Sequence, residues 1–372
     1  MAGKFELKKF SDIDIQDSFF DSLKFDYPAD EKNIGFEAWF SKKGIEGAEA
    51  LVFKDDDGLG AFICLKDENE SIPLKEKILP INSRKKISTL FIAERYRRQR
   101  LGEGALGLAL WEWQKSSQNE IYITVFEKHK LLIKQLEIFG FQLVGHNLNG
   151  ECVYLKSRFD IDYSTPYKSF PFINPNFKKA GYLIVNDYYH DTLFPYSELS
   201  RTFQEQLSLS VSNGMSKIYI GNQFKLPHYQ IGEPIFIYRK YTKKDGQKPK
   251  YKSCLTSFCI VSNVLQVKLN HKKLMSLEEL LEKIGNKSVF DKEDLAAKYQ
   301  NDKNLMIIEM LYYGYFGSGN NVNQAWLSEN DLWSLPDVYP TEVHLRPDQF
   351  QKILQKGDID VSNVIINSSK TC

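Results

Sequence analysis

The amino-acid sequence predicts an α/β domain, with a mixed sheet flanked by helices, followed by an α+β domain built on a small β-barrel. Strand and helix signals alternate through residues 1–158, and many short strand signals follow from residue 181 onward. Between them, residues 159–180 carry three prolines and no clear period. We expect domains at 1–158 and 181–372, with 159–180 as a linker or as an extended segment packed on a surface.

The composition favours a folded protein of two ordinary domains, because 42% of the 372 residues are hydrophobic and 26% are charged. The net charge of +1 gives no general attraction to nucleic acid or membranes, so such binding needs a local patch. No apolar run approaches the length of a membrane span. The five cysteines are scattered without CxxC pairs, which favours reduced thiols in a cytoplasmic protein: Cys64, Cys152, Cys254, Cys259 and Cys372.

The first unit opens with a strand, two helical pieces and a hairpin, predicted at Phe5–Phe10, Ile15–Leu23, Phe36–Ser41, Ala48–Lys54 and Leu59–Lys66. The sequence DDDG at 55–58 predicts the hairpin turn. Its three aspartates suit a solvated turn better than a metal loop.

The rest of the first unit continues the alternation of strands and helices. The expected elements are a strand at Lys86–Ile92, a helix from Leu101 to about Ser116, a strand at Ile121–Phe126, a helix at His129–Phe139, and strands at Phe141–Gly145 and Glu151–Lys156. The stretch Ala105–Trp111 is apolar on all sides, which predicts a helix buried against a sheet. Gly140 is the expected C-cap of the helix before it.

The most informative stretch is LFIAERYRRQRLGEGAL at 90–106, where a strand runs into a basic, glycine-bearing turn that opens a helix. Such a turn aims unpaired backbone N–H groups at one point, and the helix dipole adds positive potential there. Gly102 and Gly104 allow close approach of the backbone, and Arg97, Arg98 and Arg100 add charge. The stretch therefore predicts a pyrophosphate site.

This stretch resembles the cofactor motif R/Q-x-x-G-x-G/A of the GNAT acetyltransferases, matched by Gln99, Gly102 and Gly104. The FGF sequence at 139–141 also resembles that family's turn after the following helix. The resemblance covers residues 1–158 and implies acetyl-CoA as co-substrate. Loop amides would hold its pyrophosphate, and the end of the preceding strand would pair with its pantetheine arm. The implied cofactor-binding residues are Leu90, Phe91, Ile92, Arg97, Arg98, Gln99, Arg100, Leu101, Gly102, Glu103 and Gly104.

The resemblance also implies direct attack of a primary amine on the thioester. The sequence departs from the family where a tyrosine often protonates the leaving thiolate, because Leu136 stands there. Tyr122 or Tyr154 could protonate the thiolate instead, although a tyrosine on a strand is more often a core residue. Otherwise water protonates the thiolate, or the domain has lost this catalytic function. Glu94 and Glu127 are candidates for the base, although surface charges are the more common role of such residues.

The second unit contains short strand signals at Gly181–Asn186, Lys217–Ile220, Pro234–Tyr241, Ser257–Val264 and Leu305–Tyr312, with helices at Ser276–Ile284 and Arg346–Lys356. The stretch QIGEPIFIYR at 230–239, followed by a long hairpin and a second apolar strand, resembles PUA-like barrels of the ASCH and EVE kind. This resemblance implies binding of RNA or modified nucleotides. The alternative is a scaffold or dimerisation domain.

The hairpin at 238–252 carries seven Lys or Arg residues and three tyrosines against Asp245. Basic groups can contact phosphates and tyrosines can stack on bases, so this segment is a candidate RNA contact. A lysine-rich tip that keeps a sheet edge soluble is the alternative. No metal site is predicted, because the histidines at 190, 228, 271 and 344 lack ligand spacing. His190 with Asp191 lacks a nucleophile beside it.

The sequence therefore predicts an N-acetyltransferase that moves acetyl from acetyl-CoA to a primary amine. The acceptor is not identified, and an RNA-linked amine is one candidate. The alternative is a protein that binds acyl-CoA and a nucleotide or nucleic acid with little or no catalysis.

Overall fold

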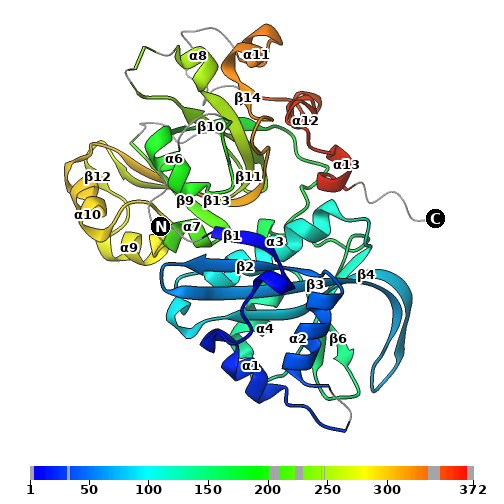
Figure 1. The fold of residues 1–372 in the computed structure, drawn as a ribbon. Helices are drawn as coiled ribbons and strands as arrows, with labels where there is room; N and C mark the ends of the chain where they lie inside the picture. The colour runs from blue at the N-terminus through cyan, green and yellow to red at the C-terminus, as the bar shows by residue number, and fades with distance from the viewer. Residues whose placement is uncertain are drawn as a thin grey trace.

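The structure is a computed structural model that describes residues 4–31, 34–200, 204, 210–222, 229–243, 245–246, 248–333 and 344–366. It contains two sheets joined by a packed connecting segment (Figure 1). None of the helices in these ranges is both long and apolar enough to cross a membrane.

The first sheet is mixed and has the strand order β1-β2-β3-β4-β5-β7-β6. Only the β4–β5 pair is parallel; the other neighbouring pairs are antiparallel. The strands are β1 Lys4–Lys9, β2 Glu49–Asp55, β3 Gly58–Pro73, β4 Ile78–Ile92, β5 Glu120–Val125, β6 Gln142–His146 and β7 Cys152–Ser157. This confirms the mixed sheet that the alternating signals predicted.

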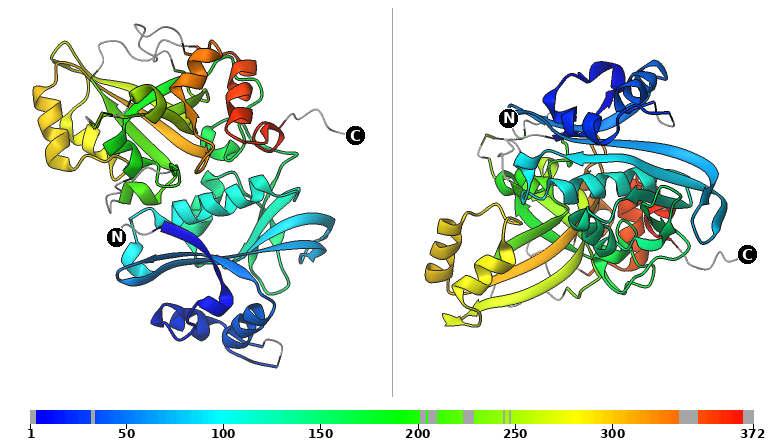
Figure 2. Two further views of the ribbon diagram at one scale, coloured as in Figure 1. Left: turned by 45° about the horizontal axis from the view of Figure 1, so that its top comes forward. Right: turned by 90° about the horizontal axis from the view of Figure 1, so that it is seen from below.

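Helices cover both faces of this sheet. Helices α1 (Asp21–Asp26) and α2 (Phe36–Ile45) lie on one face, and α3 (Leu101–Lys115) lies on the other, between the two sheets (Figures 1 and 2). The all-round apolar character of α3 follows from its position, because a helix enclosed by two layers has no polar side. The ring of Trp111 on α3 packs edge-on against that of Tyr312 in the second unit, with the two ring centres 5.1 Å apart.

Two predictions in the first unit need correction. The helix expected at Ile15–Leu23 is instead a 3-10 turn at Ser18–Phe20 followed by α1, because the Asp17 side chain accepts a hydrogen bond from the Phe19 N–H and starts the turn there. Strands β3 and β4 also extend well beyond the expected hairpin. Their outer halves carry many charged residues, so hydrophobic periodicity did not reveal them.

The segment 159–180 is buried only in part, because Phe159 at its start is exposed. Phe170, Phe172 and Ile173 are completely buried and belong to a hydrophobic core that continues through both units. The buried Lys156 ammonium donates hydrogen bonds of 2.6 Å to the carbonyl oxygens of Phe139 and Lys168. These buried residues of the segment therefore pack in the core between the two sheets.

The second sheet is curled into a half-barrel with the strand order β8-β10-β11-β13-β9. The strands are β8 Gly181–Asn186, β9 Ser216–Gly221, β10 Pro234–Lys240, β11 Cys254–Leu269 and β13 Leu305–Tyr315; the two-residue strands β12 Lys272–Lys273 and β14 Val322–Asn323 pair with β11. Within the described ranges β8 and β9 do not pair with each other, so the predicted barrel is open.

The connecting segment contains the single-turn helix α5 Pro166–Ser169. Helices complete the second unit: α6 Asp187–Leu193, α9 Leu277–Ile284, α10 Lys292–Asn301, α11 Gln324–Glu329 and α12 Pro347–Lys356, with the single-turn helices α7 Ser210–Asn213, α8 Pro249–Lys252 and α13 Val361–Val364. The prediction missed α10, because only Leu295 and Tyr299 of its ten residues are buried. Its N-cap, Asp291, accepts a hydrogen bond from the Asp294 N–H.

Candidate functional site

The first feature of the candidate site is a gap in the ladder between β4 and β5. The two strands pair only over Arg84–Ile87 and Glu120–Ile123. Beyond this point β4 continues to Ile92 paired with β3, while Thr124 and Val125 pair with β7. In the described pairings, the β5 side of Leu90, Phe91 and Ile92 is therefore open. Unpaired main-chain groups of a strand can accept an extended ligand as an additional strand.

Ser88 marks the point where the two strands separate. Cys64 pairs with Thr89 and Leu65 pairs with Ile87, so Ser88 is a bulge without a partner on β3. Ser88 also lies just past the last residue of β4 that pairs with β5. A bulge next to a gap leaves backbone groups that are available to a bound molecule.

The loop after β4 ends at the N-terminus of α3, and no side chain caps this helix. The first backbone N–H of α3 with an intrahelical bond is that of Gly104, which donates to Arg100 O at 3.1 Å. The amides of Leu101, Gly102 and Glu103 precede it and are oriented along the helix axis. A Cβ on Gly102 would have Ile92 Cγ1 as its nearest neighbour, at 4.0 Å. The loop amides and the open end of β4 are thus adjacent.

The loop backbone is unusual at two arginines, since Arg98 and Arg100 have φ values of 64° and 62°. These values lie in the left-handed region of backbone conformation, and non-glycine residues with this conformation cluster at functional sites. The three arginine side chains differ in their partners. Arg97 pairs with Glu94 on the surface, whereas the guanidinium of Arg100 contacts Glu103 at 2.8 Å and Ser216 O at 2.6 Å. The Arg98 side chain is exposed.

The second unit touches this loop from the side of β9. The side-chain amides of Asn213 and Asn286 donate to the carbonyl oxygens of Gln99 and Arg98, at 3.1 and 2.9 Å. A Cβ on Gly104 would overlap with the carbonyl oxygen of Asn213. Gly104 is therefore required by packing between the units, whatever its part in binding a cofactor.

The predicted proton donors are buried and already bonded. Tyr122 donates its hydroxyl proton to Glu68, and Tyr154 donates to Glu137 Oε1 at 3.1 Å. Burial and the adjacent carboxylate raise the pKa of both phenols, that of Tyr154 to about 12. A phenol held this way is a weak acid. Leu136, at the position of the missing tyrosine, is completely buried in the core.

The predicted bases are also surface groups in the structure. Glu94 pairs with Arg97, and both side chains are more than two-thirds exposed. Glu127 follows β5 and lies 3.5 Å from the imidazole of His146. Neither carboxylate lines the pocket that opens beside Ser88.

A pocket of about 260 Å³ opens beside Ser88, on the sheet face opposite α3. No sequence signal predicted this pocket, because its wall combines residues of α2, β3 and β4 with one residue on either side of α2. The lining residues are Ile34, Trp39, Lys42, Lys43, Ala48, Cys64, Leu65, Lys66 and Ser88. Three of these residues are lysines, and no carboxylate is present in this wall of described residues. Lys43 and Lys66 pair with Glu46 and Glu68 beside the pocket, at 2.6 and 3.0 Å.

The described part of the segment 238–252 does not present all of its predicted RNA contacts. Tyr238 and Tyr241 are buried, so neither can stack on a base from its position. Arg239 is buried and pairs with Asp191 at 2.7 Å. Tyr251 is 61% exposed, and the described lysines at the tip are exposed or half-buried. Lys244 lies outside the described residues.

His190 and Asp191 form a buried network with Arg239 and Thr256. The imidazole contacts Asp191 Oδ1 at 2.9 Å and Thr256 Oγ1 at 2.7 Å. All four side chains are buried, so the network holds α6 against β10 and β11 and offers no reactive group to solvent. A separate pocket of about 300 Å³ lies at the open side of the half-barrel; its wall includes Tyr189, Phe290, Lys240, Lys298 and Asp302.

Comparisons with known proteins found similarity only among solved structures. No family model matches the chain, and no curated protein matches it. A variant of an ASCH protein from Zymomonas mobilis is 12% identical with a TM-score of 0.30, over 48% of this chain and 96% of its own. Arabidopsis thaliana Naa50, in complex with the bisubstrate analogue CoA-Ac-MVNAL, is 19% identical with a TM-score of 0.29, over 42% and 99%. A GNAT-family acetyltransferase from Streptococcus agalactiae is 16% identical with a TM-score of 0.30, over 41% and 95%.

Proposed function

We propose that this protein is an acetyl-CoA-dependent N-acetyltransferase. The observation that carries the proposal is the adjacency of the uncapped α3 N-terminus and the open edge of β4, joined at Gly102 and Ile92. A pyrophosphate needs several converging N–H donors, and a pantetheine arm needs an unpaired strand edge. This loop and this strand end supply both within one continuous stretch of chain.

In this proposal the amides of Leu101, Gly102 and Glu103 hold the pyrophosphate. The pantetheine arm pairs with β4 from Ile92 towards Leu90, which brings the thioester to the bulge at Ser88. Backbone N–H groups at the bulge would stabilise the oxyanion formed when the amine attacks. The C–S bond of the tetrahedral intermediate breaks, and water protonates the thiolate that leaves, since Leu136 replaces a tyrosine and both Tyr122 and Tyr154 are bonded to carboxylates. The proton that the amine loses on forming the amide passes to water.

The acceptor would enter through the pocket beside Ser88. The pocket wall has three lysines and no carboxylate. Lys42 and Lys43 share Glu46, and Lys66 pairs with Glu68, so the lysines outnumber their carboxylate partners by one. This excess of positive charge favours an acceptor that carries an anionic group near its amine. It also favours the neutral, nucleophilic form of that amine. An RNA-linked amine, with its phosphates, meets this requirement.

The test measures release of CoA thiol from acetyl-CoA with paired acceptors that differ by one phosphate or carboxylate. We expect turnover to favour the anionic member of each pair. Lys42→Glu should raise KM for the anionic acceptor severalfold and leave folding unchanged, because this side chain is 66% exposed. Equal turnover of both members would contradict the acceptor assignment.

A binding protein with little catalysis is the second candidate. It is favoured by the buried Leu136 and by the two carboxylate-bound tyrosines. Such a protein would bind acetyl-CoA and release no thiol with any acceptor. A panel of amines that includes tRNA and small anionic amines distinguishes the two functions.

A further inference from the structure

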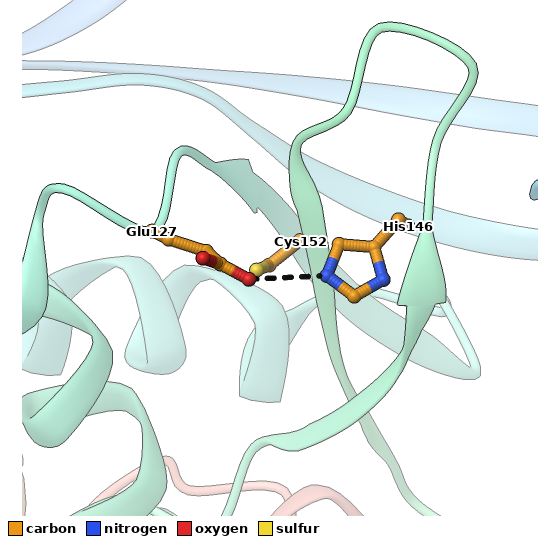
Figure 3. A group of neighbouring side chains, drawn as sticks. All are labelled: Glu127, His146 and Cys152. Atoms are coloured by element: carbon orange, nitrogen blue, oxygen red, sulfur yellow. Dashed lines mark ion pairs between the residues drawn. The ribbon is translucent and has the colours of Figure 1, made fainter.

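Three potential metal ligands converge at one end of the first sheet, outside the proposed acetyl-CoA loop. They are Glu127, which follows β5, His146, the last residue of β6, and Cys152, the first residue of β7 (Figure 3). One donor atom from each side chain lies within 4.8 Å of the others. The sequence did not suggest this cluster, because its members are spread over 26 positions, on two strands and in the turn after a third.

The strand pairing explains the convergence. His146 and Cys152 are direct partners in the antiparallel β6–β7 ladder, so their side chains leave the sheet on the same face. Cys152 also pairs with Val125 at the end of β5, two residues before Glu127. The thiol and the imidazole are thus held by the sheet, while the Glu127 side chain, 78% exposed, can adjust.

The chemistry of the three groups fits one kind of ion. Thiolate sulfur, imidazole nitrogen and carboxylate oxygen are the usual protein ligands of Zn²⁺. Nitrogen and oxygen atoms bound to a tetrahedral zinc ion lie about 3.3 Å apart. Glu127 Oε1 and His146 Nε2 are already 3.5 Å apart. A thiolate and a carboxylate together balance the charge of a divalent cation.

We propose that Glu127, His146 and Cys152 form a binding site for one Zn²⁺ ion with a fourth, open position. The ion would connect the turn at 126–129, which leads into α4 (Lys130–Ile138), to the edge strand β6 and its neighbour β7. This site does not depend on acetyl transfer, and it can be tested without acetyl-CoA.

The test uses the full-length protein and Co²⁺ as a spectroscopic substitute for Zn²⁺. We expect one equivalent of Co²⁺ to produce a thiolate-to-metal charge-transfer band, which Zn²⁺ then removes by competition. Cys152→Ser should abolish the band. Glu127→Ala should weaken Co²⁺ binding about tenfold or more, and it should not affect folding because the side chain is exposed.

Two other thiols provide matched controls. Cys64→Ser, a buried thiol on β3, and Cys372→Ser, outside the described residues, should both retain the band. Zn²⁺ should raise the melting temperature of the wild type and of both controls, but not that of Cys152→Ser. Absence of a band in the wild type, a band that persists in Cys152→Ser, or unchanged affinity in Glu127→Ala would overturn the proposal.

Discussion

At the scale of single residues, the two glycines of the cofactor motif have different surroundings. The position of a Cβ on Gly102 is open, with its nearest neighbour 4.0 Å away, whereas a Cβ on Gly104 would overlap with the Asn213 carbonyl oxygen. The sequence motif treats both as cofactor residues. The contact with Asn213 could not be predicted, because it joins positions more than a hundred residues apart.

Alanine substitutions separate these two roles. Gly102→Ala should leave the free energy of unfolding unchanged or raise it by up to about 1 kcal/mol, since alanine favours the helix. Gly104→Ala should lower it by about 1–3 kcal/mol through overpacking. Urea unfolding measures both values, and equal effects of the two substitutions would contradict the packing role of Gly104.

His190 predicts a pH dependence of stability. Its complete burial lowers its pKa, in spite of the opposing effect of Asp191. Below about pH 6.5 the unfolded chain binds a proton here that the folded protein does not, so stability falls as the pH decreases.

Chemical denaturation between pH 8 and pH 5.5 measures this effect. The wild type should lose stability below pH 6.5 with a contribution from His190 of up to about 1.4 kcal/mol per pH unit. The curve of a folded His190→Asn variant should lack this contribution. The same slope in both proteins would show that His190 is not responsible.

At the scale of elements, α3 connects the proposed cofactor loop to the second unit. Arg100 at its start pairs with Glu103 and donates to Ser216 on β9. Burial alone would raise the pKa of Glu103, but the Arg100 charge and the hydrogen bonds to Arg100 and Ser216 lower it overall. The sequence predicted the helix and the basic turn from local signals. The role of Arg100 between the units was not predictable, because Ser216 is distant in sequence.

Breaking this buried pair should be costly. Arg100→Ala should lower the free energy of unfolding by about 3–5 kcal/mol, because it leaves the Glu103 carboxylate buried without its partner. Arg100→Met combined with Glu103→Met should recover most of that loss. A double-mutant cycle by urea unfolding measures the coupling, and strictly additive effects would show that the pair is not coupled.

At the scale of the whole molecule, the two units share one hydrophobic core. Trp111 and Trp113 on α3 pack against Tyr312 and Phe172, respectively. Composition and proline content at 159–180 predicted a boundary; along the chain, the first sheet ends with β7 before this segment and the second sheet begins with β8 after it. The burial within this segment was not predictable, because periodicity describes a segment and not the surface that covers it.

A shared core predicts cooperative unfolding of the entire chain. Calorimetry should show a single transition, and a fragment of residues 1–158 should aggregate because it exposes the apolar face of α3. Two separated transitions, or a stable monomeric fragment, would show that the units fold independently.

The central claim is that the amides at the start of α3 hold the pyrophosphate of acetyl-CoA. Calorimetric titration of the wild type and of Gly102→Glu tests it directly, because a Cβ fits at Gly102 without a clash and a carboxylate added beside these amides would repel the ligand. We expect binding to the wild type at a ratio of one to one and no detectable binding to a folded Gly102→Glu variant. Failure of the wild type to bind, or equal affinity of the variant, would contradict the account.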